Sequence, residues 1–315
     1  MLEHVYVCRH GFRLSWETQL WTPPTGIPRD PPLSKHGVDQ AHELARFLKD
    51  DLGITSPEQA KQERIAILSS PLYRCVQTAT PVAEALDLPI LIEPGLAEWY
   101  LPVRRGLHPA LAEPSLLRRH FSRVEPDRAA WEPLLTPARV GESMRAIHLR
   151  CAKLAPLLAD RLAAKGFTRA IVFTHAATAI ALCRALAGDV RLGDDVLSEG
   201  AIEPGQAEQL GLWKDEERLP VGAATCSVSK FTANGGDWQR VWDGRTDFLE
   251  RGEERRWDFS FVEEIAEDGI DDSTGQEISA TKSDQYKDLP TAAPHESKQH
   301  AQAQTPAEVA SGGKL

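Results

Sequence analysis

The strongest constraint in the sequence is an alternation of short β-branched or aliphatic runs with stretches whose apolar side chains recur every three to four residues. The runs are typical of buried strands, and the longer stretches are typical of amphipathic helices. Residues 64–71 predict a strand and loop that lead into a helix over Tyr73–Leu86, and Ala170–Thr174 leads likewise into Ala176–Leu186. Such units favour an α/β fold, in which a mainly parallel sheet carries helices on both faces.

Other segments extend this pattern. Val5–Cys8 predicts a strand that can lie at the centre of the sheet, and Pro89–Ile92 predicts another strand. Ser34 can cap a helix whose apolar positions continue to Leu48, and Glu142–Ala164 predicts one long amphipathic helix. Antiparallel edge strands, separated by Asn-Gly-Gly and Asp-Gly turns, are expected over Thr225–Phe231, Trp238–Trp242 and Arg256–Phe259.

Residues 1–262 are expected to form a single domain, although a length of 315 residues would also permit two ordinary ones. Residues 101–135 contain several prolines and show no clear period, so we expect them to form a cap inserted over the site. From residue 263 to residue 315, aromatic and branched apolar residues nearly vanish, which predicts a disordered acidic tail.

The charge balance argues against several classes of function. The chain has 36 Lys and Arg against 46 Asp and Glu, so direct binding of nucleic acid by a broad basic face is not expected. No apolar run approaches the roughly 18 residues that a membrane span needs, and the first residues do not resemble a secretory leader. The five cysteines are odd in number and scattered, which favours reduced thiols. We therefore expect an intracellular protein without membrane association.

Four polar motifs follow predicted strands, at the edge where open α/β sheets bind their ligands. They are Arg9-His10-Gly11-Phe12-Arg13, Ser70-Pro71-Leu72-Tyr73-Arg74, Glu98-Trp99-Tyr100 and Thr174-His175-Ala176. Arginine forks match phosphate oxygens two at a time, and a neutral imidazole can act as a nucleophile at cellular pH. Three arginines, two histidines and one carboxylate at one edge therefore predict a phosphoryl-binding site.

Each of these residues taken alone is more commonly structural, and only their convergence favours chemistry. The remaining histidines without such context are interpreted as surface or helix-face residues, and none has the spacing of a metal ligand: His36, His42, His108, His120 and His148.

The ordered motifs resemble the histidine phosphatase superfamily, which includes the phosphoglycerate mutases, over about residues 1 to 235. The resemblance also uses Pro32–Gly37, at the start of a predicted helix, and Gly141-Glu142-Ser143. It implies a phosphoglycerate mutase-like fold and a metal-independent phosphatase that needs no cofactor. The implied substrates are phosphomonoesters, either a phosphorylated small molecule or a phosphoprotein.

The resemblance also implies roles for individual residues. His10 would be the nucleophile that becomes phosphohistidine, and Glu98 would protonate the leaving oxygen and then activate water. The phosphate pocket would consist of Arg9, Arg13, Arg74 and His175, and His175 would count among the catalytic residues with His10 and Glu98.

Arg13 resembles the additional arginine of the protein-phosphatase-like branch, whereas Ala176 stands where phytases have an aspartate. Within the superfamily, the chain resembles the phosphatase-like subunit of the fungal RNA polymerase III transcription factor C complex, through segments that include Arg13–Trp16, Cys226-Ser227 and Phe248–Glu254. This resemblance implies an alternative function as a scaffold with little or no activity. Its partners would be transcription-factor subunits, and its location would be nuclear rather than cytoplasmic.

Overall fold

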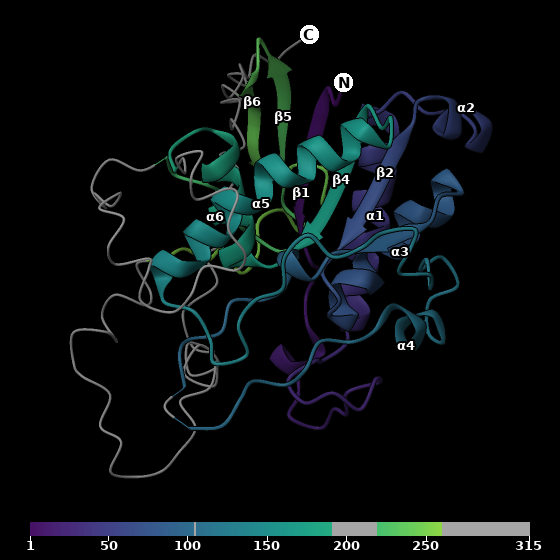
Figure 1. Cartoon of the computed structure of the whole chain (residues 1–315). Helices are drawn as coiled ribbons and strands as arrows, with labels where there is room; N and C mark the ends of the chain where they lie inside the picture. Colours follow the sequence, from purple (N-terminus) through teal and green to yellow (C-terminus); the bar gives the residue numbers. More distant parts are fainter. Residues whose placement is uncertain (104, 191–218, 260–315) are drawn as a thin grey trace, which may run out of the picture.

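The computed structural model describes residues 1–103, 105–190 and 219–259. Its sheet has the strand order β3-β2-β4-β1-β5-β6 (Figure 1). The first four strands in the chain run parallel, and β5 and β6 add an antiparallel edge beside β1. The predicted α/β fold is therefore confirmed. The strand bounds are β1 His4–Arg9, β2 Ile65–Ser69, β3 Ile90–Ile92, β4 Arg169–Thr174, β5 Val228–Asn234 and β6 Asp237–Arg245.

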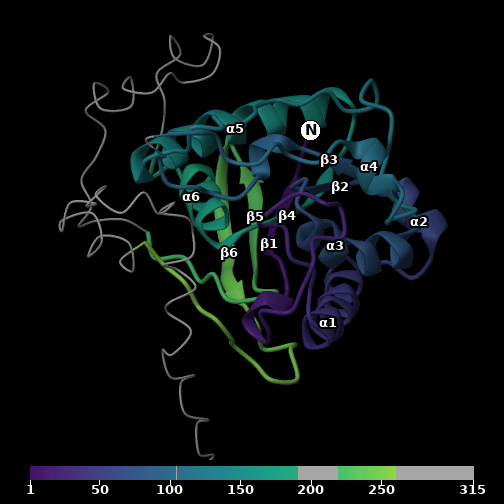
Figure 2. The same cartoon turned by 90° about the horizontal axis from the view of Figure 1, so that it is seen from below.

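Helices cover both faces of the sheet because its strands are apolar on both sides. The side chains of Val5 and Val7 in β1 pack in one cluster with α5 (Met144–Ala164) and α6 (Ala176–Leu186). Tyr6 and Cys8, which point the other way, pack in a second cluster with α1 (Lys35–Asp51) and α3 (Tyr73–Leu86). Figure 2 shows these helix pairs on opposite sides of the sheet.

Local capping explains where two of the helices begin. The side chain of Ser34 accepts a hydrogen bond from the backbone N–H of Gly37, as expected for the cap of α1. Ser143 accepts from Ala146 in the same way, so α5 begins at Met144 and not at the predicted Glu142. The helix α3 spans the predicted residues but has no capping side chain next to it in the sequence.

The segment predicted as a cap contains one short helix, α4 (Pro114–Arg118), and is otherwise irregular. It is attached to the sheet at β3, because the backbone of Ile90 exchanges hydrogen bonds with Arg123 and Glu125. The other short elements of the described residues are α2 (Pro57–Gln62) and the 3-10 turns η1 (Leu14–Trp16) and η2 (Pro94–Leu96). The domain boundaries remain a prediction, and the predicted tail over residues 263–315 lies outside the described residues.

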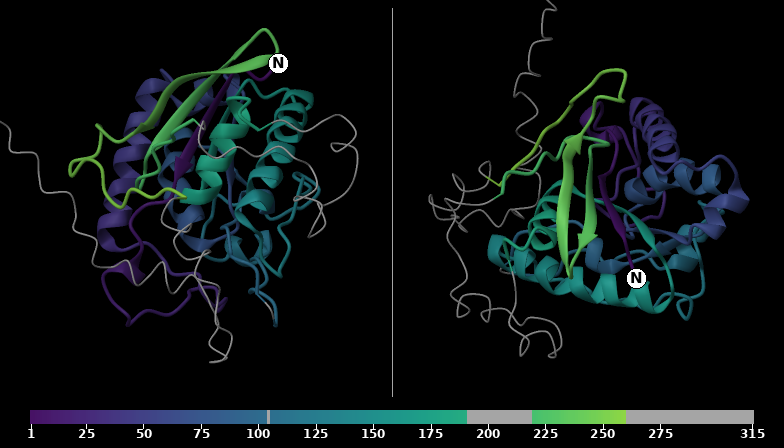
Figure 3. Two further views of the ribbon diagram at one scale, coloured as in Figure 1. Left: turned by 90° about the vertical axis from the view of Figure 1, so that its left-hand side faces the viewer. Right: turned by 90° about the horizontal axis from the view of Figure 1, so that it is seen from above.

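Two expectations for the C-terminal strands are wrong. Arg256–Phe259 forms no strand, because Trp257 and Phe259 pack their rings against Trp99 while the chain stays irregular. Asp243 and Gly244 do not form a turn either, since they lie within β6 at a shift in its register against β5. The Asn-Gly-Gly turn is confirmed: Gly235 and Gly236 have φ of 61° and 99° and join β5 to β6 (Figure 3).

Within the described ranges, no helix is both long and apolar enough to cross a membrane. All five cysteines are free and buried, in agreement with the expected reduced thiols.

Candidate active site

The register of the parallel strands brings the polar motifs together. Arg9 in β1 lies opposite Thr174 in β4, so the next residues, His10 and His175, leave the sheet side by side. The backbone N–H of His10 donates to the carbonyl of Thr174 at 3.0 Å. Ser70 continues β2 at the same edge, where its backbone N–H donates to Phe173 at 2.9 Å. The motifs therefore meet at the carboxyl ends of neighbouring strands.

The His10 imidazole lies below the protein surface with a defined tautomer. Its Nδ1 is 2.8 Å from the carbonyl oxygen of Gly11, and because a carbonyl only accepts, Nδ1 carries the proton. The Nε2 lone pair is then available for attack. Burial lowers the pKa of His10 well below its usual value, and the positive charges of Arg74, Arg9 and Arg13 lower it further. The ring is consequently neutral at physiological pH.

His175 faces His10, with the ring centroids 5.3 Å apart and the rings nearly perpendicular. It is fully buried, and its Nε2 lies 2.8 Å from Oγ of Ser70. Its Nδ1 lies 3.3 Å from Oε2 of Glu98 and 3.2 Å from Nη2 of Arg74. Burial, followed by the charge of Arg74, lowers the pKa of His175 well below its usual value. Both rings of the pair are therefore neutral.

Arg74 and Glu98 form an ion pair beside the two rings. Nη2 of Arg74 lies 3.1 Å from Oε2 of Glu98. Arg74 is 1% exposed, whereas the Glu98 side chain is 19% exposed, so the carboxylate is the part of this cluster that reaches solvent. A carboxylic acid in that place can exchange protons with a leaving group or with water.

Arg9 is held from behind by backbone carbonyls. Its Nη1 donates to the carbonyl oxygens of Ala223 and Arg255, both at 2.5 Å. Burial lowers its pKa to about 9, which still leaves the guanidinium charged at neutral pH. These contacts use only backbone atoms, so no carboxylate neutralises the charge through them.

Arg13 approaches the site from η1. Its guanidinium lies 4.3 Å from the ring centroid of Trp16, and the Trp16 ring is 6.1 Å from the His10 ring. An isolated antiparallel β-bridge between the backbones of Arg13 and Leu33 holds this turn against the residues that precede α1. The structure thus places all six residues singled out in the sequence at one end of the sheet.

Two guanidinium groups of this cluster, those of Arg9 and Arg74, keep open donors. In the described part of the chain, the Nε atoms of Arg9 and Arg74 are buried and have no hydrogen-bond partner. A buried donor without a partner costs about 1–3 kcal/mol, and more when it is charged. An anion with several oxygens, such as a phosphoryl group, is the ligand that removes this cost.

Among the described residues, three side chains of this cluster are also close enough together to hold a metal ion. Atoms of His10, Glu98 and His175 lie within 4.8 Å of one another. However, the guanidinium of Arg74 lies 3.2 Å from His175 and 3.1 Å from Glu98, so a cation there would face a fixed positive charge. The electrostatics favour an anion at this position.

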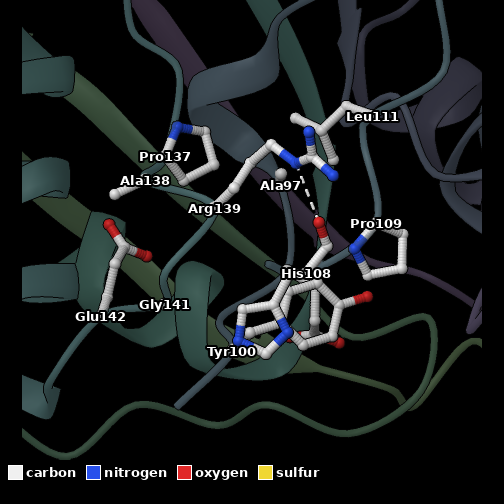
Figure 4. Close-up of a pocket in the computed structure, with 11 residues that line it drawn as sticks. Ala97, Tyr100, His108, Pro109, Leu111, Pro137, Ala138, Arg139, Gly141 and Glu142 are labelled. Atoms are coloured by element: carbon white, nitrogen blue, oxygen red, sulfur yellow. Dashed lines mark hydrogen bonds between the residues drawn. The ribbon is translucent and has the colours of Figure 1, made fainter. Parts of the chain in front are cut away.

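A pocket opens beside Glu98 under the irregular segment that precedes α5. It is lined mainly by small and apolar residues together with Tyr100, His108 and Arg139. Figure 4 shows the His108 ring stacked on Tyr100, with centroids 4.7 Å apart, and Arg139 donating to the His108 carbonyl. This pocket is the space next to the Glu98 carboxylate, and it is open enough to receive part of a small ligand.

The interpretation of His108 as a surface or helix-face residue is wrong. His108 is 4% exposed, because its ring bridges Leu101 and Arg29 in addition to the stack on Tyr100. His148 lies on a helix, as expected, but it is fully buried in α5, where its Nε2 contacts Arg184. Their spacing in the sequence carried no signal of burial, since both depend on partners far along the chain.

The sequence motifs did not identify several residues that hold the site in place. Thr78 accepts from the backbone N–H of Gly11, and Gln40 accepts from that of Phe12, so these side chains fix the loop that carries His10. Asp30 accepts from the backbone N–H of Tyr73 and from Nη1 of Arg74, and so takes the place of the absent cap of α3. Thr78 and Gln40 lie on predicted helices, but no local pattern identified their partners.

Comparisons with known proteins agree with this geometry. Residues 5–194 match the model of the histidine phosphatase superfamily (branch 1), which confirms the resemblance inferred from the motifs. The transcription factor tau 55 kDa subunit of Saccharomyces cerevisiae is 31% identical over 274 residues, which is 84% of this chain and 60% of that protein.

Two insect proteins are also similar. The ecdysteroid-phosphate phosphatase of Drosophila melanogaster is 27% identical over 257 residues, covering 69% of this chain and 32% of that protein. The crystal structure of the ecdysone phosphate phosphatase of Bombix mori, in complex with tungstate, has a TM-score of 0.52 at 19% identity, over 82% of this chain and 99% of that one. The chain thus spans only part of the length of the curated relatives it matches.

Proposed function

The chain belongs to the histidine phosphatase superfamily, and from this premise we propose that it hydrolyses phosphomonoesters through a phosphohistidine at His10. The observation that carries the proposal is the pair of neutral imidazoles, 5.3 Å apart, beside two buried guanidinium groups with open donors. Such an arrangement suits a tetrahedral dianion attacked by a ring nitrogen.

In the first step, Nε2 of His10 attacks the phosphorus atom. The N–P bond forms as the bond to the ester oxygen breaks, and the leaving oxygen takes a proton from Glu98. Because Nδ1 donates to the Gly11 carbonyl, the positive charge that develops on the ring during attack is stabilised by a fixed acceptor.

In the second step, water attacks the phosphohistidine. Glu98 accepts a proton from the water as the new P–O bond forms and the N–P bond breaks, which releases inorganic phosphate and restores the neutral ring. Arg9, Arg13, Arg74 and His175 hold the equatorial oxygens in both steps. No step draws on a metal ion or a cofactor.

The decisive experiment combines turnover with trapping of the intermediate. Wild type should release phosphate from a panel of phosphorylated sugars, nucleotides and phosphotyrosine peptides, and should become labelled by a 32P-substrate in an acid-labile form. His10→Ala should abolish both signals, whereas the exposed His120→Ala should retain them. Turnover by His10→Ala at the wild-type rate would refute the proposal.

A second candidate function is that of a scaffold subunit in a transcription-factor complex, which would be nuclear. It is supported by the similarity to the yeast tau 55 kDa subunit over 84% of the chain, well beyond the residues that match the superfamily model. This candidate predicts that the chain purifies from its own cells with large transcription-factor subunits identified by mass spectrometry, and that His10→Ala leaves the assembly intact. A monomer with strong and selective turnover would contradict it.

A further inference from the structure

The segment after β6, residues 246–259, lies against the loop that carries His10, and we call it the strap (Figure 2). The Glu254 carboxylate binds the side chains of His36 and Gln40 on α1. The backbone carbonyl of Glu254 accepts a hydrogen bond from the backbone N–H of Thr225. Gln40 in turn accepts from the backbone N–H of Phe12. The next residue of the strap is therefore fixed relative to the proposed phosphate loop.

That residue is Arg255, and its backbone has an unusual conformation. Its φ is 51°, in the left-handed region that residues with a side chain rarely adopt. The conformation directs its carbonyl oxygen to Nη1 of Arg9. Backbone strain of this kind persists where surrounding contacts enforce it and is often found at functional sites.

The Arg255 side chain lies at the entrance to the same site. Its guanidinium carbon is 5.4 Å from the ring centroid of Phe12 and 5.3 Å from that of Trp16. The Trp16 ring also contacts Arg13, at 4.3 Å, and lies 6.1 Å from the ring of His10. Arg255 thus brings a fourth guanidinium to the proposed phosphate site, separated from His10 by one aromatic ring.

Within the part of the chain that the structure describes, no carboxylate pairs with this positive charge. Among the described residues, the Arg255 guanidinium has ring contacts but no hydrogen bond or ion pair. The neighbouring Arg256, in contrast, lies 3.6 Å from Glu253, and its side chain is 60% exposed. Although the formal net charge of the chain is −10, residues 1–103, 105–190 and 219–259 thus leave this cation beside the proposed site without an ion-pair partner.

Taking the proposed phosphatase function as given, we propose that Arg255 selects phosphomonoesters whose leaving group carries a second negative charge. A planar guanidinium stacked on rings has its N–H edges free for a carboxylate or a second phosphate. Glu254 anchors the strap, and with it Arg255, to α1. The Arg255 contact should therefore favour a leaving group whose second negative charge lies at a matching distance from the ester oxygen.

The test compares phenyl phosphate with 4-carboxyphenyl phosphate, which adds one anion one ring length from the ester oxygen. The readout is the ratio of kcat/KM for the carboxylated substrate to kcat/KM for the plain one. Arg255→Asn should lower this ratio about 5- to 10-fold, because it removes a charge-assisted contact while asparagine still tolerates the left-handed backbone. Most of the change should appear in KM.

Arg256→Asn is the matched control, since it removes the same charge one residue away and should leave the ratio at its wild-type value. Arg255→Gly is a second variant that relieves the backbone conformation and keeps the carbonyl contact to Arg9. An unchanged ratio in both Arg255 variants, or an equal loss on both substrates, would overturn the proposal. If the wild type hydrolysed neither of the two esters, this result would instead count against the phosphatase function itself.

Discussion

Asp30 and Arg74 are coupled across 44 residues of sequence: Oδ1 of Asp30 accepts from Nη1 of Arg74 at 3.4 Å. Nη2 of the same guanidinium contacts Glu98 and His175, so the carboxylate of Asp30 orients a group at the centre of the site. Asp30 also accepts from the backbone N–H of Tyr73 at the start of α3. It is therefore a positioning residue for the proposed phosphatase chemistry.

We predict that Asp30→Asn lowers kcat/KM about tenfold at pH 7.5, because a hydrogen bond to a charged group contributes about 1.5–3 kcal/mol. Burial raises the pKa of Asp30 to about 6, so acidification neutralises the wild-type carboxylate as well. The activity gap between wild type and Asp30→Asn should consequently narrow as the pH falls from 7.5 to 5. Asp39→Asn, at an exposed site on α1, is the control, and an equal kcat/KM for Asp30→Asn and wild type at pH 7.5 would contradict the role.

Stability should also depend on pH through His175. Its folded-state pKa lies well below 6.5, so below pH 6.5 the unfolded chain gains a proton at this residue that the folded chain does not. The free energy of unfolding is therefore lost as the pH falls, by about 1.4 kcal/mol between pH 7.5 and 5.5 for this one group. In urea titrations at both pH values, His175→Gln should lose less stability than wild type by about that amount. The exposed His120→Gln serves as the control, and an identical loss in His175→Gln and wild type would argue against burial of a neutral ring.

Glu93 should be a major determinant of stability. Its carboxylate is fully buried and accepts from the backbone N–H groups of Gly95, Leu134 and Leu135 and from Nε1 of Trp131. Glu93→Gln turns an amide group toward these donors, so we expect a loss of about 3 kcal/mol in the free energy of unfolding, measured by urea denaturation. Glu113→Gln, at an exposed acid, should change it by less than about 1 kcal/mol. If the two variants had a similar free energy of unfolding, the hydrogen bonds to Glu93 would not be a major source of stability.

Gly37 should resist substitution although it lies within α1. A Cβ at this position would overlap the carbonyl oxygen of Phe12 and lie 2.8 Å from its nitrogen. Alanine in a helix normally gains up to about 1 kcal/mol over glycine, but here overpacking should reverse the sign and cost about 2 kcal/mol. Thermal unfolding of Gly37→Ala against the exposed Asp39→Ala measures this directly. A rise in Tm for Gly37→Ala would mean that the loop from His10 to Arg13 does not depend on close contact with α1.

The core elements were predictable because their signals are local. The periodicity over Tyr73–Leu86 and the cap at Ser34 depend on residues within a few positions of each other, and both agree with the structure. Arg256–Phe259 was misread because its alternating aromatic residues also suit a segment that packs its rings without pairing its backbone. His108 was misread, and the burial of His148 was not expected, because the burial of both rings depends on partners from other parts of the chain.

The amino-acid sequence alone determined the alternation of strands and helices. Because crossovers between parallel strands are right-handed, this alternation also determined that the polar motifs meet at the edge formed by the carboxyl ends of the strands. Only the tertiary structure decided which nitrogen of His10 carries a proton and that Asp30 orients Arg74. It also decided that Arg255 contacts Trp16, a residue far from it in the sequence. The physical reason is that periodicity reports which face of an element is buried, whereas hydrogen bonds and charge contacts depend on distances between segments that pack together only when the chain folds.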